Sequence, residues 1–301
     1  MNPHRRALLE LHVCVVLWGF TAILGKLITL PAQALVWWRM LLVTLALACF
    51  PRVWRGLAKI PPRLIAVYAG IGAVVAVHWL TFYGSIKLAN ASVAATCMAL
   101  APAVTALIEP VLTGARFERH NLLLGLLVIP GVALVVGGIP GSMHLGFWVG
   151  VISAALASVY NLLNKRYLGH HDAMAVTWVE LGAGFLVVAA LLPTMGPFMG
   201  PAGGSVVLPS VQDGAWLLVL AILCTLIPFA VSLATLRHLS AFTAQLAINL
   251  EPVYAIGIAV LFLGEARELD GLFFLGVAIV LAAVFGHGWL QTRLTDSRRS
   301  V

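Results

Sequence analysis

The sequence predicts an all-α integral membrane protein with ten transmembrane helices, arranged as two five-helix repeats of inverted topology. Three observations predict this fold: the composition, the length of the apolar segments and an internal repeat. Hydrophobic residues make up 61% of the 301 residues and charged residues only 10%, whereas a soluble domain carries about 25% charged residues. A chain of this composition does not fold as a soluble globule.

The apolar residues form successive blocks about as long as the ~20 residues that a helix needs to cross a bilayer. Short breaks rich in Pro, Gly or basic residues separate the blocks. The first block follows Arg5 and Arg6 and leads directly into another, so we expect it to be retained rather than cleaved as a signal peptide. The predicted helices span residues 9–28, 33–50, 64–84, 91–112, 121–139, 146–164, 173–192, 214–236, 242–263 and 271–290.

The basic residues between these helices indicate the orientation of the chain. If the N-terminus is cytoplasmic, fourteen of the eighteen Lys and Arg residues lie on the inner side. The outer side then holds only Lys87 and Arg267, and the two remaining cations lie within helices. Because cytoplasmic loops carry the excess of Lys and Arg, we expect a bacterial inner membrane protein with both termini, including the tail 291–301, in the cytoplasm. The net charge of +7 comes from basic residues on the inner side of the predicted helices. This location indicates the orientation in the lipid bilayer, so we expect the bilayer and not nucleic acid as the partner.

Two stretches separated by a constant 150 residues indicate duplicated halves. Residues 97–115 align with residues 247–265, and each stretch belongs to the fourth helix of a five-helix half. Because five is odd, the second half enters the membrane from the opposite side, and such inverted repeats are typical of transporters. The predicted repeats are residues 9–139 and 146–290. The identical pairs are Leu100 with Leu250, Pro102 with Pro252, Ile108 with Ile258 and Gly114 with Gly264.

Several of these motifs together resemble the drug/metabolite transporter superfamily, EamA type. They are LWGFTAILGK at residues 17–26, Arg39, APAVTALIEPVLTG at 101–114 and NLEPVYAIGIAVLFLGE at 249–265. The resemblance implies two EamA units around a central cavity and a carrier that works by alternating access. Similarity to the amino-acid exporter branch further implies apolar or aromatic amino acids as substrates. The sequence departs from the family at Ala115, where the first half often has an acid like Glu265.

Two prolines lie near the centres of the fourth and ninth predicted helices. Pro102 and Pro252 each remove a backbone hydrogen bond and free a carbonyl about one turn earlier. Such breaks mark substrate-lining hinges in transporters, but a neighbouring helix could also satisfy a purely structural kink. Both interpretations stay open.

Amides and rings on several helices predict a substrate site near the midplane, between the two halves. Gln245, Asn249 and Pro252 follow a four-then-three spacing and therefore share one face of a helix. Polar amides in a membrane are costly unless they are paired or hydrated, although they also join helices, and rings often only pack or anchor. The predicted substrate-binding residues are Trp79, Tyr83, Met98, Tyr160, Asn164, Phe229, Gln245 and Asn249.

Four ionisable residues inside predicted helices are candidates for ion coupling or charge recognition. His78 could carry a proton or be a hydrogen-bonded structural residue. Glu251 could couple protons or form a structural cap or ion pair. Lys26 and Arg39 could attract a substrate carboxylate or extend to the outer headgroups.

The sequence contains no motif for metal binding, redox chemistry or catalysis. The four cysteines lie too far apart for a metal knuckle or a redox pair. No phosphate loop, HExxH motif or nucleophile elbow occurs, so we expect no enzyme activity, no cofactor and no bound metal. A membrane enzyme acting on lipid-linked substrates and a non-transporting sensor or subunit are the alternatives to a carrier of a small-molecule substrate. The sequence leaves a homodimer open.

Overall fold

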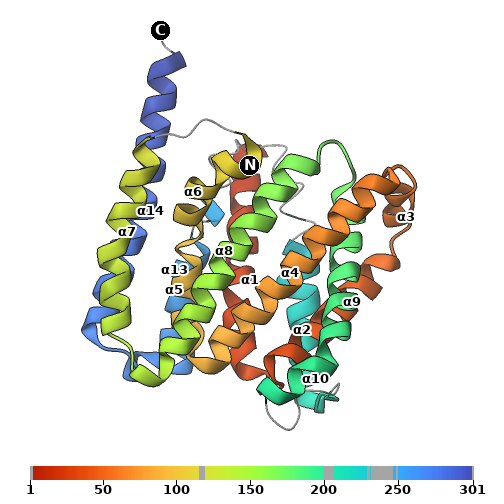
Figure 1. Cartoon of the computed structure of the whole chain (residues 1–301), viewed down its shortest axis with the longest axis horizontal. Coiled ribbons are helices and arrows are strands. Elements are labelled where there is room, and N and C mark those ends of the chain that lie inside the picture. The colour runs from red at the N-terminus through yellow and green to blue at the C-terminus, as the bar shows by residue number, and fades with distance from the viewer. Residues whose placement is uncertain are drawn as a thin grey trace.

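The computed structural model describes residues 3–114, 119–199, 207–228, 231, 247–248 and 250–299, which form helices and no strand. The long helices form a bundle, with α7 and α14 paired on one side of it (Figure 1). The helices are α1 (Pro3–Leu27), α2 (Ala32–Ala48), α3 (Pro51–Leu57), α4 (Pro62–Leu88), α5 (Ala91–Met98), α6 (Ala101–Thr113), α7 (Arg119–Gly137), α8 (His144–Tyr167), α9 (Ala173–Met199), α10 (Val211–Leu218), α13 (Glu251–Ile258) and α14 (Gly271–Arg299), with the shorter elements η1 (Gly141–Met143), η2 (Val219–Leu226), η3 (Ala259–Leu263) and η4 (Glu265–Arg267).

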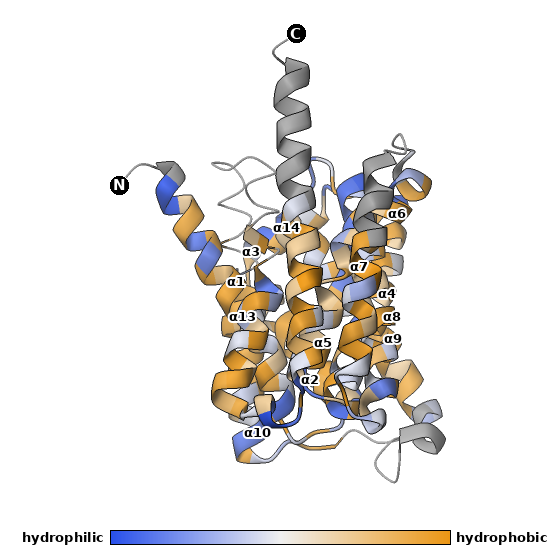
Figure 2. Cartoon of the chain, turned by 90° about the vertical axis from the view of Figure 1, so that its left-hand side faces the viewer, coloured by the Kyte–Doolittle hydropathy of each residue, from blue (hydrophilic) through white to orange (hydrophobic). Residues whose placement is uncertain are grey.

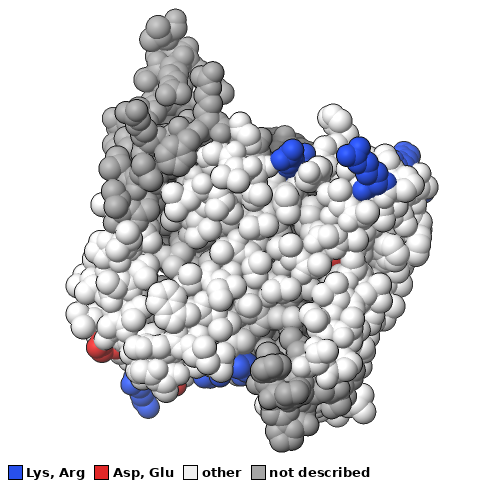
Figure 3. Space-filling view, in the orientation of Figure 1, with Lys and Arg blue, Asp and Glu red and all other residues white. Residues whose placement is uncertain are grey.

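Helix length and hydropathy mark this chain as a multi-pass membrane protein. Within the described residues, 5 helical segments are long and apolar enough to cross a bilayer, or 6 if α2 and α3 are counted as one bent span. Shorter apolar helices accompany them. A broad apolar band covers the middle of the molecule (Figure 2). On the face shown in Figure 3, Lys and Arg gather near the two ends and the band between them carries almost no charge.

The chain alternates between the two ends of the bundle. Helix α1 begins and α14 ends at the same end, which also holds α3 and the turn between α8 and α9 (Figure 1). We call this the terminal end. At the opposite end, the Asn90 side chain donates to Glu268 over 3.0 Å, and the Asp270 amide donates to the Gly138 carbonyl over 3.3 Å. These contacts tie loops from both halves of the chain together.

Equivalent positions in the two halves interrupt a helix in the same way. Leu100 has φ −80° and ψ −17°, and Leu250, 150 residues later, has φ −79° and ψ −12°. Their amides donate to the carbonyls three residues earlier, of Cys97 and Ala247, over 3.0 and 3.1 Å. A shared break at a constant spacing supports the duplication predicted from the sequence.

The prolines follow these breaks rather than bending a continuous helix. Pro102 and Pro252 each lie at the second position of the helix that restarts, α6 and α13. Proline is tolerated there because the first turn of a helix needs no amide donor. Both stretches end at glycines in the left-handed region, Gly114 with φ 73° and Gly264 with φ 67°. The predicted central kinks are therefore helix ends followed by new helix starts.

Glycines allow two helix pairs to approach closely. A Cβ added to Gly72 of α4 would lie 2.0 Å from the Glu180 carbonyl oxygen of α9. A Cβ added to Gly276 of α14 would lie 2.6 Å from the Gly131 carbonyl oxygen of α7. Small residues at such crossings are the usual means of tight packing between membrane helices.

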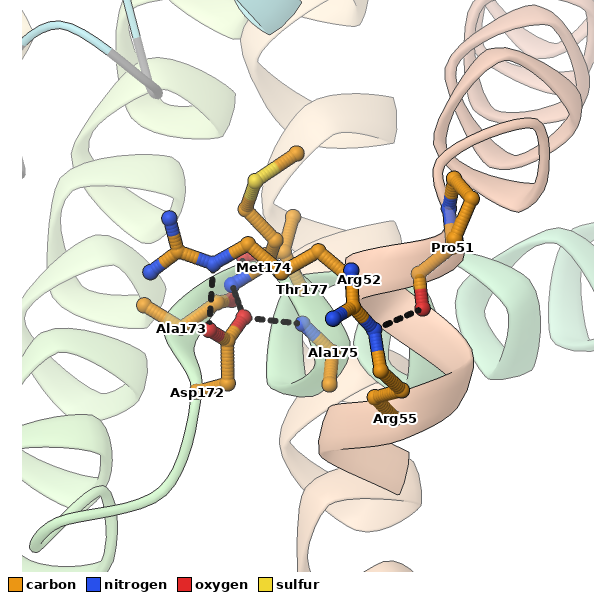
Figure 4. Close-up of polar contacts among 8 residues, drawn as sticks. All are labelled: Pro51, Arg52, Arg55, Asp172, Ala173, Met174, Ala175 and Thr177. Carbon is orange, nitrogen blue, oxygen red and sulfur yellow. Dashed lines mark hydrogen bonds and ion pairs between the residues drawn. The ribbon is translucent and has the colours of Figure 1, made fainter. Parts of the chain in front are cut away.

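Helix α3 is absent from the predicted elements. It follows α2 at an angle of 89° and starts at Pro51. It is fixed to the start of α9, because Arg52 Nε donates to Asp172 Oδ2 over 2.7 Å and Asp172 Oδ1 accepts from the Met174 and Ala175 amides (Figure 4). Burial raises the pKa of Asp172, but the hydrogen bonds from Arg52 and from the Ala175 and Met174 amides outweigh it, so the pKa lies below its ordinary value.

Candidate functional site

Arg39 is a cation buried inside the bundle. It lies on α2 and is 5% exposed. A charged side chain in a membrane interior is costly unless it faces a cavity or finds polar partners. The surroundings of Arg39 therefore define the first part of the candidate site.

Three side chains from two other helical segments surround the Arg39 guanidinium. Nη1 donates to the Tyr83 hydroxyl over 2.6 Å, and Nε and Nη2 donate to Thr225 Oγ1 over 3.1 and 2.8 Å. The guanidinium carbon lies 3.8 Å from the centre of the Trp79 ring, well within cation–π range. Among the described residues, no carboxylate forms an ion pair with Arg39. Its charge is held by a ring and two hydroxyls and is not neutralised by contact.

Thr225 is positioned by a wide helical turn. It belongs to η2, a π-helix, and its hydroxyl donates to the Leu220 carbonyl, five residues earlier, over 2.8 Å. The same oxygen accepts both bonds from Arg39. π-Helical turns are rare and occur frequently at functional sites. Thr225 is not among the predicted site residues. The sequence holds one signal for it, which is that a buried Arg39 needs hydrogen-bond acceptors.

Glu251 is the acidic side chain of this region. It is the first residue of α13, and among the described residues it forms no ion pair with Arg39. It lines a small cavity between α1, α4, α5 and α13 together with Trp18, Phe82 and Met98. Pro252 lines the same cavity. The predicted residues Met98, Glu251 and Pro252 thus lie together.

His78 lies beside this site in a hydrogen-bonded cluster. Its Nδ1 is 3.0 Å from the Ser153 carbonyl oxygen and 2.9 Å from Ser153 Oγ, and the side chain is buried. Its ring centre is 5.4 Å from that of Tyr160. Its ring centre is also 6.3 Å from that of Phe82, which lines the cavity beside Glu251. His78 has the contacts of a structural histidine, and a coupling role for it stays a prediction.

The remaining predicted residues lie apart from Arg39 or outside the described residues. Asn164 approaches Glu180, with its Nδ2 3.4 Å from Oε2. Lys26 is exposed at the last turn of α1, so it does not share the buried environment of Arg39. Pro102 is half-buried directly after the break between α5 and α6. Three predicted residues lie outside the described residues: Phe229, Gln245 and Asn249.

Comparisons with known proteins identify the family. The model of the EamA-like transporter family matches residues 6–137 and 144–290. A crystal structure that carries no functional name is similar to this chain, with a TM-score of 0.62 and 18% sequence identity over 97% of this chain and 98% of that one. No curated protein sequence matches. The matches cover both halves of the chain, which therefore belongs to the EamA-like transporter family, whose members are membrane transporters of small molecules.

Proposed function

We propose that this protein is a secondary transporter that carries apolar or aromatic amino acids by alternating access around the site between Arg39 and Glu251. The observation that carries the proposal is the buried Arg39, which stacks on Trp79 and, among the residues that the structure describes, forms no ion pair with a carboxylate. The planar guanidinium matches a carboxylate geometrically. A solute with a carboxylate would supply the missing counter-charge.

The position of Glu251 extends this argument to zwitterions. Arg39 would bind the carboxylate of an amino acid, and Glu251 would bind its ammonium group. Phe82 and Met98 line the cavity beside Glu251, whose volume of about 10 Å³ holds about one water molecule, so alternating access would widen it before these side chains contact a solute. A pocket with few polar groups and with the rings of Trp18 and Phe82 favours small amphipathic solutes over sugars or phosphates.

The architecture that we propose has ten spanning helices in two EamA units, residues 9–139 and 146–290, with both termini in the cytoplasm of a bacterial inner membrane. The shared breaks at Leu100 and Leu250 support two equivalent units that could exchange roles. Family membership favours transport over the alternatives of a lipid-linked enzyme or a sensor. The lipid bilayer and the small solute are the proposed partners, and a homodimer is compatible with this arrangement.

The orientation predicts which ends of the protein react with a membrane-impermeant thiol reagent. In a background without Cys14, Cys49, Cys97 and Cys224, a cysteine replacing Arg55 of α3 should be labelled only in inverted vesicles. A cysteine replacing Ala266 of η4 should be labelled in intact cells, because the positive-inside rule places the terminal end in the cytoplasm. Both native residues are exposed, so accessibility reports sidedness. Labelling of both cysteines from one side would contradict this topology.

The substrate class predicts a pattern of competition in proteoliposomes that contain only this protein. Phenylalanine and leucine should exchange across the membrane and compete with each other, whereas glucose and glucose phosphate should not compete. Phenethylamine lacks the carboxylate and should compete weakly, because it leaves Arg39 unpaired. Liposomes without protein provide the background rate. Exchange of sugars in preference to both amino acids would overturn the proposed substrate class.

A further inference from the structure

Glu180 is a buried carboxylate with a single, long hydrogen bond among the described residues. It lies on α9, seven positions after Ala173, or about 10 Å along the helix axis, and it is 6% exposed. Its Oε2 is 3.4 Å from Asn164 Nδ2, which is a long hydrogen bond. Within the part of the chain that the structure describes, neither its Oε1 nor the buried Asn164 Oδ1 has a hydrogen-bond partner. Two oxygens without a described donor therefore belong to neighbouring side chains on α8 and α9.

The described cations of α3 and α8 have partners other than Glu180: Arg52 and Arg55 of α3 bond to Asp172 and the Pro51 carbonyl, and Lys165 and Arg166 of α8 bond to Glu109 and the Leu112 carbonyl. On α4, Gly72 contacts the Glu180 backbone directly, and the Tyr68 hydroxyl donates to the Tyr167 carbonyl instead of the carboxylate. On α8, Tyr160 and Asn164 are the polar groups near Glu180. Residues of α2 that pack against α9 beyond Glu180, at Gly182 and Gly184, are Thr44 and Met40. Among the described residues, no Lys or Arg forms an ion pair with Glu180.

We propose that Glu180 and Asn164 form a proton-binding site that couples solute transport to the proton gradient, which rests on the transport function proposed above. A carboxylate with one long hydrogen bond is costly in a membrane interior. Uptake of a proton converts it into a carboxyl group whose O–H can donate to Asn164 Oδ1. Only a turn of the side-chain groups is needed, because the two amide positions of Asn164 are interchangeable. The proton replaces the long bond from Asn164 Nδ2 by an O–H bond to Asn164 Oδ1, and it removes the negative charge from the Glu180 oxygen that has no donor.

The coordination available here suits a proton better than a metal ion. Hard cations such as Mg²⁺ and Ca²⁺ take six or more oxygen ligands. Glu180 and Asn164 together present three side-chain oxygens, and the Tyr68 hydroxyl of α4 donates to the Tyr167 carbonyl instead. A proton needs one acceptor and one neighbouring oxygen. The site meets that requirement.

Tyr160 connects this site with the proposed solute site. It lies one helical turn before Asn164 on α8, and its ring centre is 5.4 Å from that of His78. The His78 ring centre is in turn 6.3 Å from that of Phe82, which lines the cavity beside Glu251. Loss of the negative charge at Glu180 therefore changes the potential at the position where a zwitterion would bind. Proton binding and solute binding would then be coupled free energies, and each would change the affinity for the other by the same factor.

Infrared difference spectroscopy tests proton binding independently of transport. The purified full-length protein would be compared at about pH 9 and about pH 5, a range that includes buried glutamates. The wild type should gain a carbonyl band of a protonated carboxyl group on acidification, and Glu180→Gln should lack that band. Asn164→Leu should shift its frequency by removing the hydrogen-bond partner. Glu109→Gln is the matched control, because Glu109 pairs with Lys165 over 2.8 Å. A band unchanged in Glu180→Gln overturns the proposal.

Flux measurements test the coupling. In proteoliposomes, an imposed pH gradient should change the steady accumulation of radiolabelled phenylalanine by the wild type and by Glu109→Gln. Glu180→Gln should exchange phenylalanine at equal pH but lose the response to the gradient. Equal responses of the wild type and Glu180→Gln would overturn the coupling while leaving the transport function intact. No phenylalanine exchange by the wild type would instead count against the proposed function, and the infrared result would then decide on the proton site alone.

Discussion

Arg39→Ala should lower the affinity for amino acids by roughly 2 to 5 kcal/mol, or about 30- to 5,000-fold, because a carboxylate would lose its buried charged partner. Arg39→Lys should recover only part of this loss. An ammonium group cannot reproduce the planar fork that donates to Tyr83 and Thr225 while the guanidinium stacks on Trp79. The effect should therefore follow the shape of the cation as well as its charge.

The measurement is phenylalanine exchange in proteoliposomes, with purified protein checked for folding by its unfolding temperature. Arg55→Ala is the control, because Arg55 is an exposed arginine on α3 at the terminal end. Arg39→Ala should lower the affinity for phenethylamine, which has no carboxylate, much less than it lowers the affinity for phenylalanine. If Arg39→Ala weakened both solutes equally, Arg39 would act on the fold rather than on the carboxylate.

The hydropathy of long segments made the fold class predictable from the sequence. Apolar blocks of spanning length leave few alternatives to membrane helices, because a bilayer requires every backbone polar group to be bonded within the protein. The duplicated stretches were predictable for a similar reason, since Pro102 and Pro252 restrict the backbone at equivalent positions. These signals could not predict α3, which lies at about a right angle to α2. Seven residues are too few to show a helical pattern of hydropathy.

Partners within the site were harder to predict, because they depend on contacts between distant parts of the chain. Arg39 and Thr225 are 186 residues apart, and their contact uses a π-helical turn that no residue pattern announces. Glu180 and Asn164 meet across α8 and α9 through the side chains that face each other there. The sequence predicted that Arg39 is unusual, but only the packing of the helices shows what surrounds it.

Glu265 has a structural role, which the sequence did not predict. It is 1% exposed, and its two carboxylate oxygens accept from the Ala91 and Ser92 amides over 3.0 and 2.8 Å. It therefore caps the start of α5, an end of a helix that favours negative charge. The cap joins the fourth helix of the first half to the end of its counterpart in the second half. Ala115, the equivalent residue by sequence, has no acceptor side chain, so the second half cannot receive the same cap from it.

Glu265→Ala should accordingly lower the free energy of unfolding by about 2 to 6 kcal/mol, because two buried amides lose their acceptors at about 1 to 3 kcal/mol each. Glu265→Gln should cost less, since its amide keeps one acceptor oxygen. Unfolding of the detergent-solubilised protein measures both effects, with Arg267→Ala as the exposed control. A cysteine replacing the buried Ser92 should also react faster with an impermeant thiol reagent in the Glu265→Ala background. Unchanged unfolding and unchanged reactivity would mean that neighbouring groups at this end replace the cap, and that Glu265 does not hold the two halves together.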